Sequence, residues 1–130
     1  MREFLLVFLG GGLGSVIRYA LALVQDHLRL NPISTLGQTL LPWPTLLANV
    51  TGCVLIGLFY SVSARTDMSA ETRLLLTTGL CGGLTTFSTF SNDGIILLRS
   101  GHVGLFSIYF ALTLLLGFGG VLLGAWLGGK

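Results

Sequence analysis

Charged residues are scarce in this chain. Only 9% of its 130 residues are Asp, Glu, Lys or Arg, whereas 52% are hydrophobic and the mean hydropathy is +0.86. A soluble domain of this length could not hide so much apolar surface. The formal net charge of +2 is also too small to indicate a nucleic-acid partner. The composition therefore predicts a membrane protein in contact with the lipid bilayer.

Motifs for nucleotide binding and catalysis are missing as well. The chain has no glycine-rich phosphate loop, no nucleophile elbow and no metalloprotease motif. We therefore expect neither a nucleotide partner nor enzyme activity. The two cysteines, Cys53 and Cys81, fall within long apolar segments, where cysteine more often serves as a small packing residue than as a redox or metal site.

Long apolar segments are what the chain does contain. Four of them carry at most one charged residue each and have at least 21 residues: 4–24, 43–64, 74–98 and 103–127. Each is long enough to cross roughly 30 Å of hydrocarbon as a helix. The first is too long for the core of a signal peptide and lacks a convincing cleavage site, so we expect it to be retained. The expected fold class is an all-α membrane protein, with four transmembrane helices in a single domain over residues 1–130.

The third apolar segment is polar in its middle, where residues 82–93 read GGLTTFSTFSND. Paired glycines, and hydroxyl side chains that bond back to the backbone, favour a local break in a helix. Irregular backbone at membrane depth is tolerated only inside protein or beside a water-filled cavity. We therefore predict a break near residues 82–86, whose carbonyls could bind a cation and whose amides could bind an anion.

Two phenylalanines follow the predicted break. Phe87 and Phe90 are three residues apart, which places both rings on about the same face once the helix resumes. A ring edge carries the positive part of the aromatic quadrupole, so it attracts an anion weakly. Weak attraction suits conduction because the ion must also leave. The hydroxyl residues around the pair, including Ser88 and Thr89, distinguish it from an ordinary lipid-facing or core pair.

Polar residues in the other segments leave alternatives open. Asn49 could donate to an anion or make an interhelical hydrogen bond to the third segment. Arg18 and Asp93 are the only charges inside the segments; they could pair, or Arg18 could extend to the interface. Tyr109 shares a helix face with Thr113, and its hydroxyl could meet an anion or its ring could anchor the membrane interface.

Glycines at four-residue spacing occur inside the apolar segments and predict close helix packing, because small residues let backbones approach where water cannot drive association. They are Gly10 and Gly14, Gly79 and Gly83, and Gly120, Gly124 and Gly128.

The cations at the segment ends are divided almost evenly. One side of the predicted membrane has Arg2, Arg65, Arg73 and Lys130, and the other has Arg29 and Arg99, with Arg18 nearer to that side. So weak a bias permits insertion in both directions, although Arg65 and Arg73 could also decide a single orientation. Two oppositely oriented copies would pair about an axis in the membrane plane. Four helices alone enclose a pore poorly, which also favours a dimer.

The chain resembles the Fluc (CrcB) family of fluoride channels. The resemblance is carried by GGGLG at 10–14 with Arg18-Tyr19, by ANVTG at 48–52, and by GLCGGLTTFSTFS at 79–91. It implies an antiparallel, dual-topology homodimer with two passive pores. Such a channel exports fluoride across the cytoplasmic (inner) membrane and so reduces fluoride toxicity inside the cell.

The resemblance also implies functions for single residues. Phe87 and Phe90 would meet fluoride with their ring edges, and Asn49 would be the amide beside the pore. The carbonyls of Gly82 and Thr85 from both copies would hold a structural sodium ion. Residues implied for the polar track are Ser88, Thr89, Tyr109 and Thr113, and those near the vestibule or with a structural function are Arg18 and Asp93.

Two positions depart from the family pattern. Asp93 stands where a glutamate is common, and Gly117 stands where a hydroxyl often continues the polar track. A proton-coupled small-ion or multidrug transporter of the four-helix dual-topology type remains the alternative. Multidrug transporters of this type depend on a carboxylate in the middle of the first helix, whereas Glu3 precedes that segment. Asp93 is the candidate for a proton-coupling group.

Overall fold

The computed structural model describes residues 1–27 and 41–130, and within these ranges every regular element is a helix. The elements in chain order are α1 (Arg2–His27), α2 (Trp43–Arg65), α3 (Ala70–Leu74), the π-helix η1 (Leu75–Cys81), α4 (Gly82–Leu84), α5 (Phe87–Arg99) and α6 (Val103–Gly128). The expected all-α fold is thus confirmed for the described residues. Arg29 and most of the predicted first connection lie outside them.

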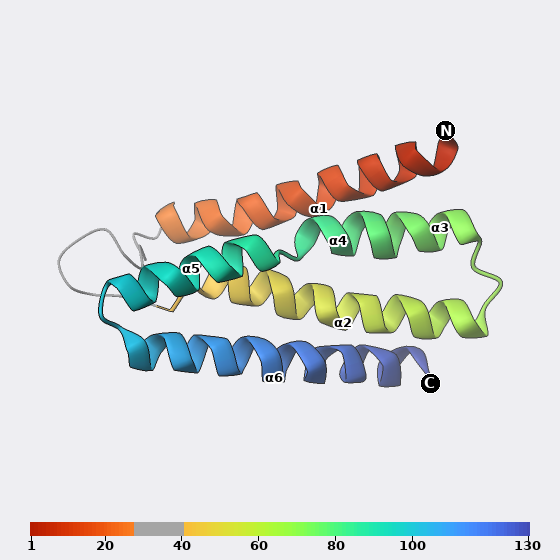
Figure 1. The fold of residues 1–130 in the computed structure, drawn as a ribbon. Helices are drawn as coiled ribbons and strands as arrows, with labels where there is room; N and C mark the ends of the chain where they lie inside the picture. The colour runs from red at the N-terminus through yellow and green to blue at the C-terminus, as the bar shows by residue number, and fades with distance from the viewer. Residues whose placement is uncertain (28–40) are drawn as a thin grey trace.

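The helices lie side by side in one bundle (Figure 1). The long helices α2 and α6 run in one direction, and α1 and the run from α3 to α5 return in the other. Both chain termini and the α2–α3 connection lie at the same end, so Arg2, Arg65, Arg73 and Lys130 gather there. Arg99, at the end of α5, lies at the opposite end.

Three described helices are long and apolar enough to cross a membrane. They comprise Arg2–Gln25 with 24 residues, Trp43–Arg65 with 23 and Val103–Gly128 with 26. At 1.5 Å per residue, each spans about 35 Å or more, the thickness of a hydrocarbon core plus part of its interface. Large apolar side chains of α1 and α6 are exposed, among them Phe8 and Phe118, as expected of lipid-facing surfaces.

The third predicted segment contains several shorter elements instead of one long helix. The chain passes through α3, η1 and α4, and then through two extended residues before α5 begins. Thr85 has φ −81° and ψ 152°, and Thr86 has φ −153° and ψ 121°. Both values lie in the β region, so the helical hydrogen-bond ladder cannot continue through these residues. The two threonines are the last two residues of the range 82–86.

Glycines set the contact between α1 and the run from η1 to α4. A Cβ atom added at Gly10 would meet the backbone of Leu75 and Gly79, and one at Gly83 would meet the backbone of Gly11. One added at Gly14 would meet the backbone of Leu80, Leu84 and Gly83. The backbones therefore touch directly, which confirms the packing predicted from the glycine spacing.

Glycines also set the contact between α2 and α6. A Cβ atom at Gly124 would meet the backbone of Val54 and Leu58, and one at Gly120 would lie 3.3 Å from the Val50 oxygen. Gly57 of α2, which its spacing did not single out, is packed as closely against Val121. These two helices are in contact over most of their length, so α2 presents a different face to the region around Thr85 and Thr86.

Candidate ion pathway between α4 and α5

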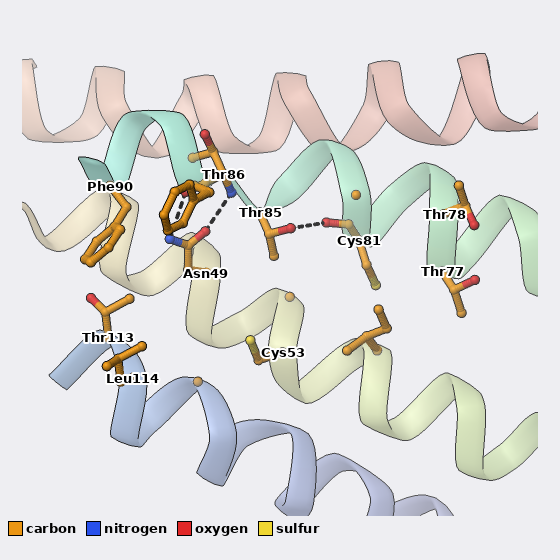
Figure 2. Close-up of a pocket in the computed structure, with 15 residues that line it drawn as sticks. Asn49, Cys53, Thr77, Thr78, Cys81, Thr85, Thr86, Phe90, Thr113 and Leu114 are labelled. Carbon is orange, nitrogen blue, oxygen red and sulfur yellow. Dashed lines mark hydrogen bonds between the residues drawn. The ribbon is translucent and has the colours of Figure 1, made fainter. Parts of the chain in front are cut away.

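A cavity of about 550 Å³ lies beside the two extended residues, lined by α2, η1, α4, α5 and α6. Figure 2 shows side chains from these elements converging on it. Of the residues singled out in the sequence, the lining includes Asn49, Gly82, Thr85, Phe87, Phe90 and Thr113, and also Cys53, Cys81 and Gly117. In the described parts of the chain, no Asp, Glu, His, Lys or Arg side chain belongs to this lining.

The side-chain amide of Asn49 binds the backbone of Thr86. Its Oδ1 accepts a hydrogen bond from the Thr86 N–H at 2.7 Å, and its Nδ2 donates to the Thr86 carbonyl oxygen at 3.2 Å (Figure 2). The sequence left two alternatives open for Asn49, and the structure shows the interhelical hydrogen bond to the third segment. One amide thus meets both polar backbone groups of an extended residue.

The carbonyl oxygens at the end of α4 have lost their usual helical donors. In a continuous helix the Thr86 N–H would donate to the Gly82 oxygen, but here it donates to Asn49. The next oxygen, that of Gly83, accepts from Ser15 Oγ at 3.5 Å and from Arg18 Nε at 3.3 Å. Arg18 therefore supports the end of α4. The Gly82 oxygen is released from its helical bond.

Thr86 also caps the following helix. Its Oγ1 accepts from the Thr89 N–H at 3.2 Å, as an N-cap side chain does. The same hydroxyl donates to Thr89 Oγ1 at 3.1 Å and shares a 3.1 Å hydrogen bond with Ser88 Oγ. The Ser88 and Thr89 hydroxyls are thus gathered around the first turn of α5. Thr89 lines a separate cavity of about 240 Å³ that also includes Arg18.

The two phenylalanine rings lie together but differ in burial. The ring centroids of Phe87 and Phe90 are 5.8 Å apart, and those of Phe90 and Tyr109 are 5.3 Å apart. Phe90 is 8% exposed and belongs to the small core with Leu97 and Tyr109, whereas Phe87 is 80% exposed in the single chain. Phe90 is therefore held by its neighbours, while Phe87 stands at the open side of the cavity.

The carboxylate of Asp93 is held by two hydroxyls. Its Oδ2 accepts from Thr45 Oγ1 at 2.8 Å and from the Tyr109 hydroxyl at 3.3 Å. Arg18 and Asp93 therefore do not pair, since Arg18 donates to the Gly83 carbonyl instead. Tyr109 is fully buried, which contradicts the alternative of an interfacial anchor for its ring.

Thr113 is placed one turn beyond Tyr109 on α6. Its Oγ1 donates to the Tyr109 carbonyl oxygen at 2.8 Å, and its side chain lines the cavity.

Sequence reasoning did not identify Ser15 or Thr45 as site residues. Ser15 could have been found from its position three residues before Arg18, on the same face of α1. Thr45 carries no comparable signal, because only the packing of α2 against α5 brings it to Asp93.

The long apolar helices, with a cavity between them that Asn49 and several threonines line, define an α-helical integral membrane protein. A family model described as CrcB-like protein, Camphor Resistance (CrcB), matches residues 5–125. The fluoride-specific ion channel FluC of Phocaeicola vulgatus is 46% identical over 127 residues, which are 98% of each chain. The protein of the same name from Thermus thermophilus is 43% identical over 130 residues, covering 99% of this chain and 97% of that one. This chain belongs to the CrcB family.

Proposed function

We propose that this chain forms a passive, fluoride-selective ion channel. The observation that carries the proposal is the pair Phe87 and Phe90, which follows the extended residues and lines the cavity. Relatives covering nearly the whole chain are named fluoride-specific ion channels. A ring edge attracts an anion weakly, and the ring itself neither donates nor takes up a proton. The polar track would continue through Ser88, Thr89, Tyr109 and Thr113.

The cavity lining supports passive flow over proton coupling. Among the described residues, none with an acidic, basic or histidine side chain lines this cavity, so the cavity itself offers no such group to carry a proton. Asp93, the candidate for coupling, is bonded to Thr45 and Tyr109 and does not line this cavity. A channel of this kind in the cytoplasmic (inner) membrane would let accumulated fluoride leave the cell and so reduce its toxicity.

The functional unit that we propose is an antiparallel, dual-topology homodimer. In it, the run from α3 to α5 crosses the membrane as a broken fourth span. A single chain leaves Phe87 80% exposed beside the cavity, and a second copy would cover this open side. The nearly even division of cations that the sequence predicts between the two sides of the membrane supports insertion in both orientations.

A structural sodium ion would bind to backbone oxygens of Gly82 and Thr85. Among the described residues, no group of three or more His, Cys, Asp or Glu side chains is placed to hold a metal ion. Gly82 lines the cavity, its oxygen is released from the helical bond, and a Cβ atom there would meet nothing within 4 Å. Hard cations prefer such oxygen ligands. Two oxygens from each of two copies would make a shared site on the dimer axis.

Fluoride efflux from liposomes containing the purified protein tests the proposed function. We expect rapid efflux down a fluoride gradient, reduced by roughly tenfold or more in Phe87→Ile, because a tenfold loss needs only about 1.4 kcal/mol at the barrier. The matched control is Phe118→Ile, a substitution at an exposed ring of α6 away from the cavity. Intact protein without fluoride permeability would refute the proposal.

Proton movement separates the channel from the coupled transporter. A pH-sensitive dye inside the same liposomes should report no proton flux tied to fluoride efflux once the membrane potential is clamped. Obligatory proton movement at a constant ratio to fluoride would favour the transporter instead.

A further inference from the structure

We propose that Asn49 is a positioning residue of the anion path, which acts through the backbone of Thr86. This inference rests on the proposed channel function and names a residue that would hold the backbone of the path in place. Asn49 would hold the junction between α4 and α5 in the one conformation that places Phe87 and Phe90 together.

The hydrogen bonds of the amide are the first argument. Oδ1 and Nδ2 bond to the N–H and the carbonyl oxygen of the same residue, at 2.7 and 3.2 Å. Because a backbone N–H can only donate, Oδ1 must face Thr86, which fixes the orientation of the whole amide. The side chain therefore pairs with Thr86 much as a neighbouring strand would.

The position of Thr86 is the second argument. It directly precedes Phe87, and its Oγ1 caps the first turn of α5 through the Thr89 N–H. A change in the backbone angles of Thr86 would therefore rotate α5 relative to α4. Phe90 would move with α5 away from its contact with Tyr109, whose ring centroid lies 5.3 Å away.

Close packing by the same face of α2 is the third argument. Gly52 lies three residues after Asn49, and a Cβ atom there would overlap the methyl group of Thr85. One turn of α2 thus contacts both extended residues: Gly52 packs against Thr85, and Asn49 is hydrogen-bonded to Thr86. Unsatisfied backbone groups are costly at membrane depth, so losing the Asn49 contact would favour a different backbone at this point.

A double-mutant cycle tests whether Asn49 acts through Thr86. One change is Asn49→Ala. The other replaces the peptide bond before Thr86 by an ester, introduced with the α-hydroxy acid analogue of threonine, which removes the N–H and keeps the side chain. We expect each change to lower fluoride efflux by about tenfold, and the pair to lower it by little more than either alone, because they remove the same hydrogen bond.

The cycle can also overturn the proposal. If the fold-reductions in efflux of the two single variants multiplied in the double variant, Asn49 would act independently of Thr86, as a direct donor to the anion would. An ester variant with full efflux would equally refute it. Thr51→Ala is the matched control, since Thr51 is an exposed hydroxyl residue of the same helix. Its efflux should equal that of the unmodified protein.

Hydrogen exchange at the Thr86 amide gives a second test that needs no ester variant. In the intact protein we expect slow exchange, unchanged by saturating fluoride, and in Asn49→Ala an exchange faster by about tenfold or more. An amide that becomes exposed when fluoride binds would show that Asn49 leaves Thr86 for the ion. That result would refute the positioning function even if the ester variant failed to fold.

Discussion

The hydroxyl of Tyr109 on α6 donates a 3.3 Å hydrogen bond to Oδ2 of Asp93 on α5. The same carboxylate oxygen accepts from Thr45 on α2 at 2.8 Å, so one acid connects three helices. An acid inside a membrane segment is costly unless its oxygens are bonded, and these two hydroxyls provide such bonds. Asp93 and its partners therefore form a structural connection beside the cavity.

Removing the Tyr109 hydroxyl should weaken this connection without disturbing the aromatic packing. We expect Tyr109→Phe to lower the free energy of unfolding by about 1 kcal/mol, the usual net contribution of one hydrogen bond. Thermal unfolding in detergent measures the loss. Tyr60→Phe is the control, because Tyr60 is an exposed tyrosine. Equal melting temperatures for Tyr109→Phe and the unmodified protein would show that the bond contributes nothing.

Thr45→Val should lower the free energy of unfolding by at least as much as Tyr109→Phe does, because the hydrogen bond from Thr45 to Asp93 is the shorter of the two. Valine keeps the shape of threonine, so the change removes little else. The expected loss is about 1–2 kcal/mol in the same unfolding measurement. Combining it with Tyr109→Phe leaves Oδ2 without either donor, so the loss should exceed the sum of the single effects. A strictly additive result would mean that the two hydroxyls stabilise the protein independently of their shared acceptor.

The contact between α1 and α4 predicts opposite tolerance at two nearby glycines. Gly14→Ala would press a methyl group into the backbone of Leu80 and Leu84, so we expect a loss of about 1–3 kcal/mol in unfolding free energy. Gly12→Ala meets open space, and the change should stay below about 1 kcal/mol. Thermal unfolding of the two variants, purified in parallel, makes the comparison. Similar melting temperatures would contradict the close approach of these helices.

Exchange of sodium for a larger cation tests the proposed backbone site. Purification and efflux with N-methylglucamine as the cation throughout should lower fluoride efflux or shift the proposed dimer to monomers, because the proposed ligand of the folded dimer would be absent. Size-exclusion chromatography and the efflux rate report the two effects. Replacing chloride by gluconate with sodium retained is the control. Indifference to the identity of the cation would count against the site.

Three conclusions could be drawn from the sequence, because each depends on residues close together in the chain. The membrane class follows from charge-poor segments, and three of these are long apolar helices in the structure. The helix contacts follow from glycines four residues apart, which share one face of a helix whatever lies opposite. The family resemblance, carried by short motifs, is confirmed by the match over residues 5–125.

The partner of each polar group was decided only by the tertiary structure. Asn49 and Thr86 are 37 positions apart, Thr45 and Asp93 are 48 apart, and Arg18 and Gly83 are 65 apart. Their pairing depends on how far each helix is rotated and shifted along its neighbours, which local spacing does not specify. Composition and local spacing thus determined a membrane protein of the CrcB family with a polar third segment. Helix packing determined that Asn49 bonds to backbone and that Arg18 and Asp93 bind different partners.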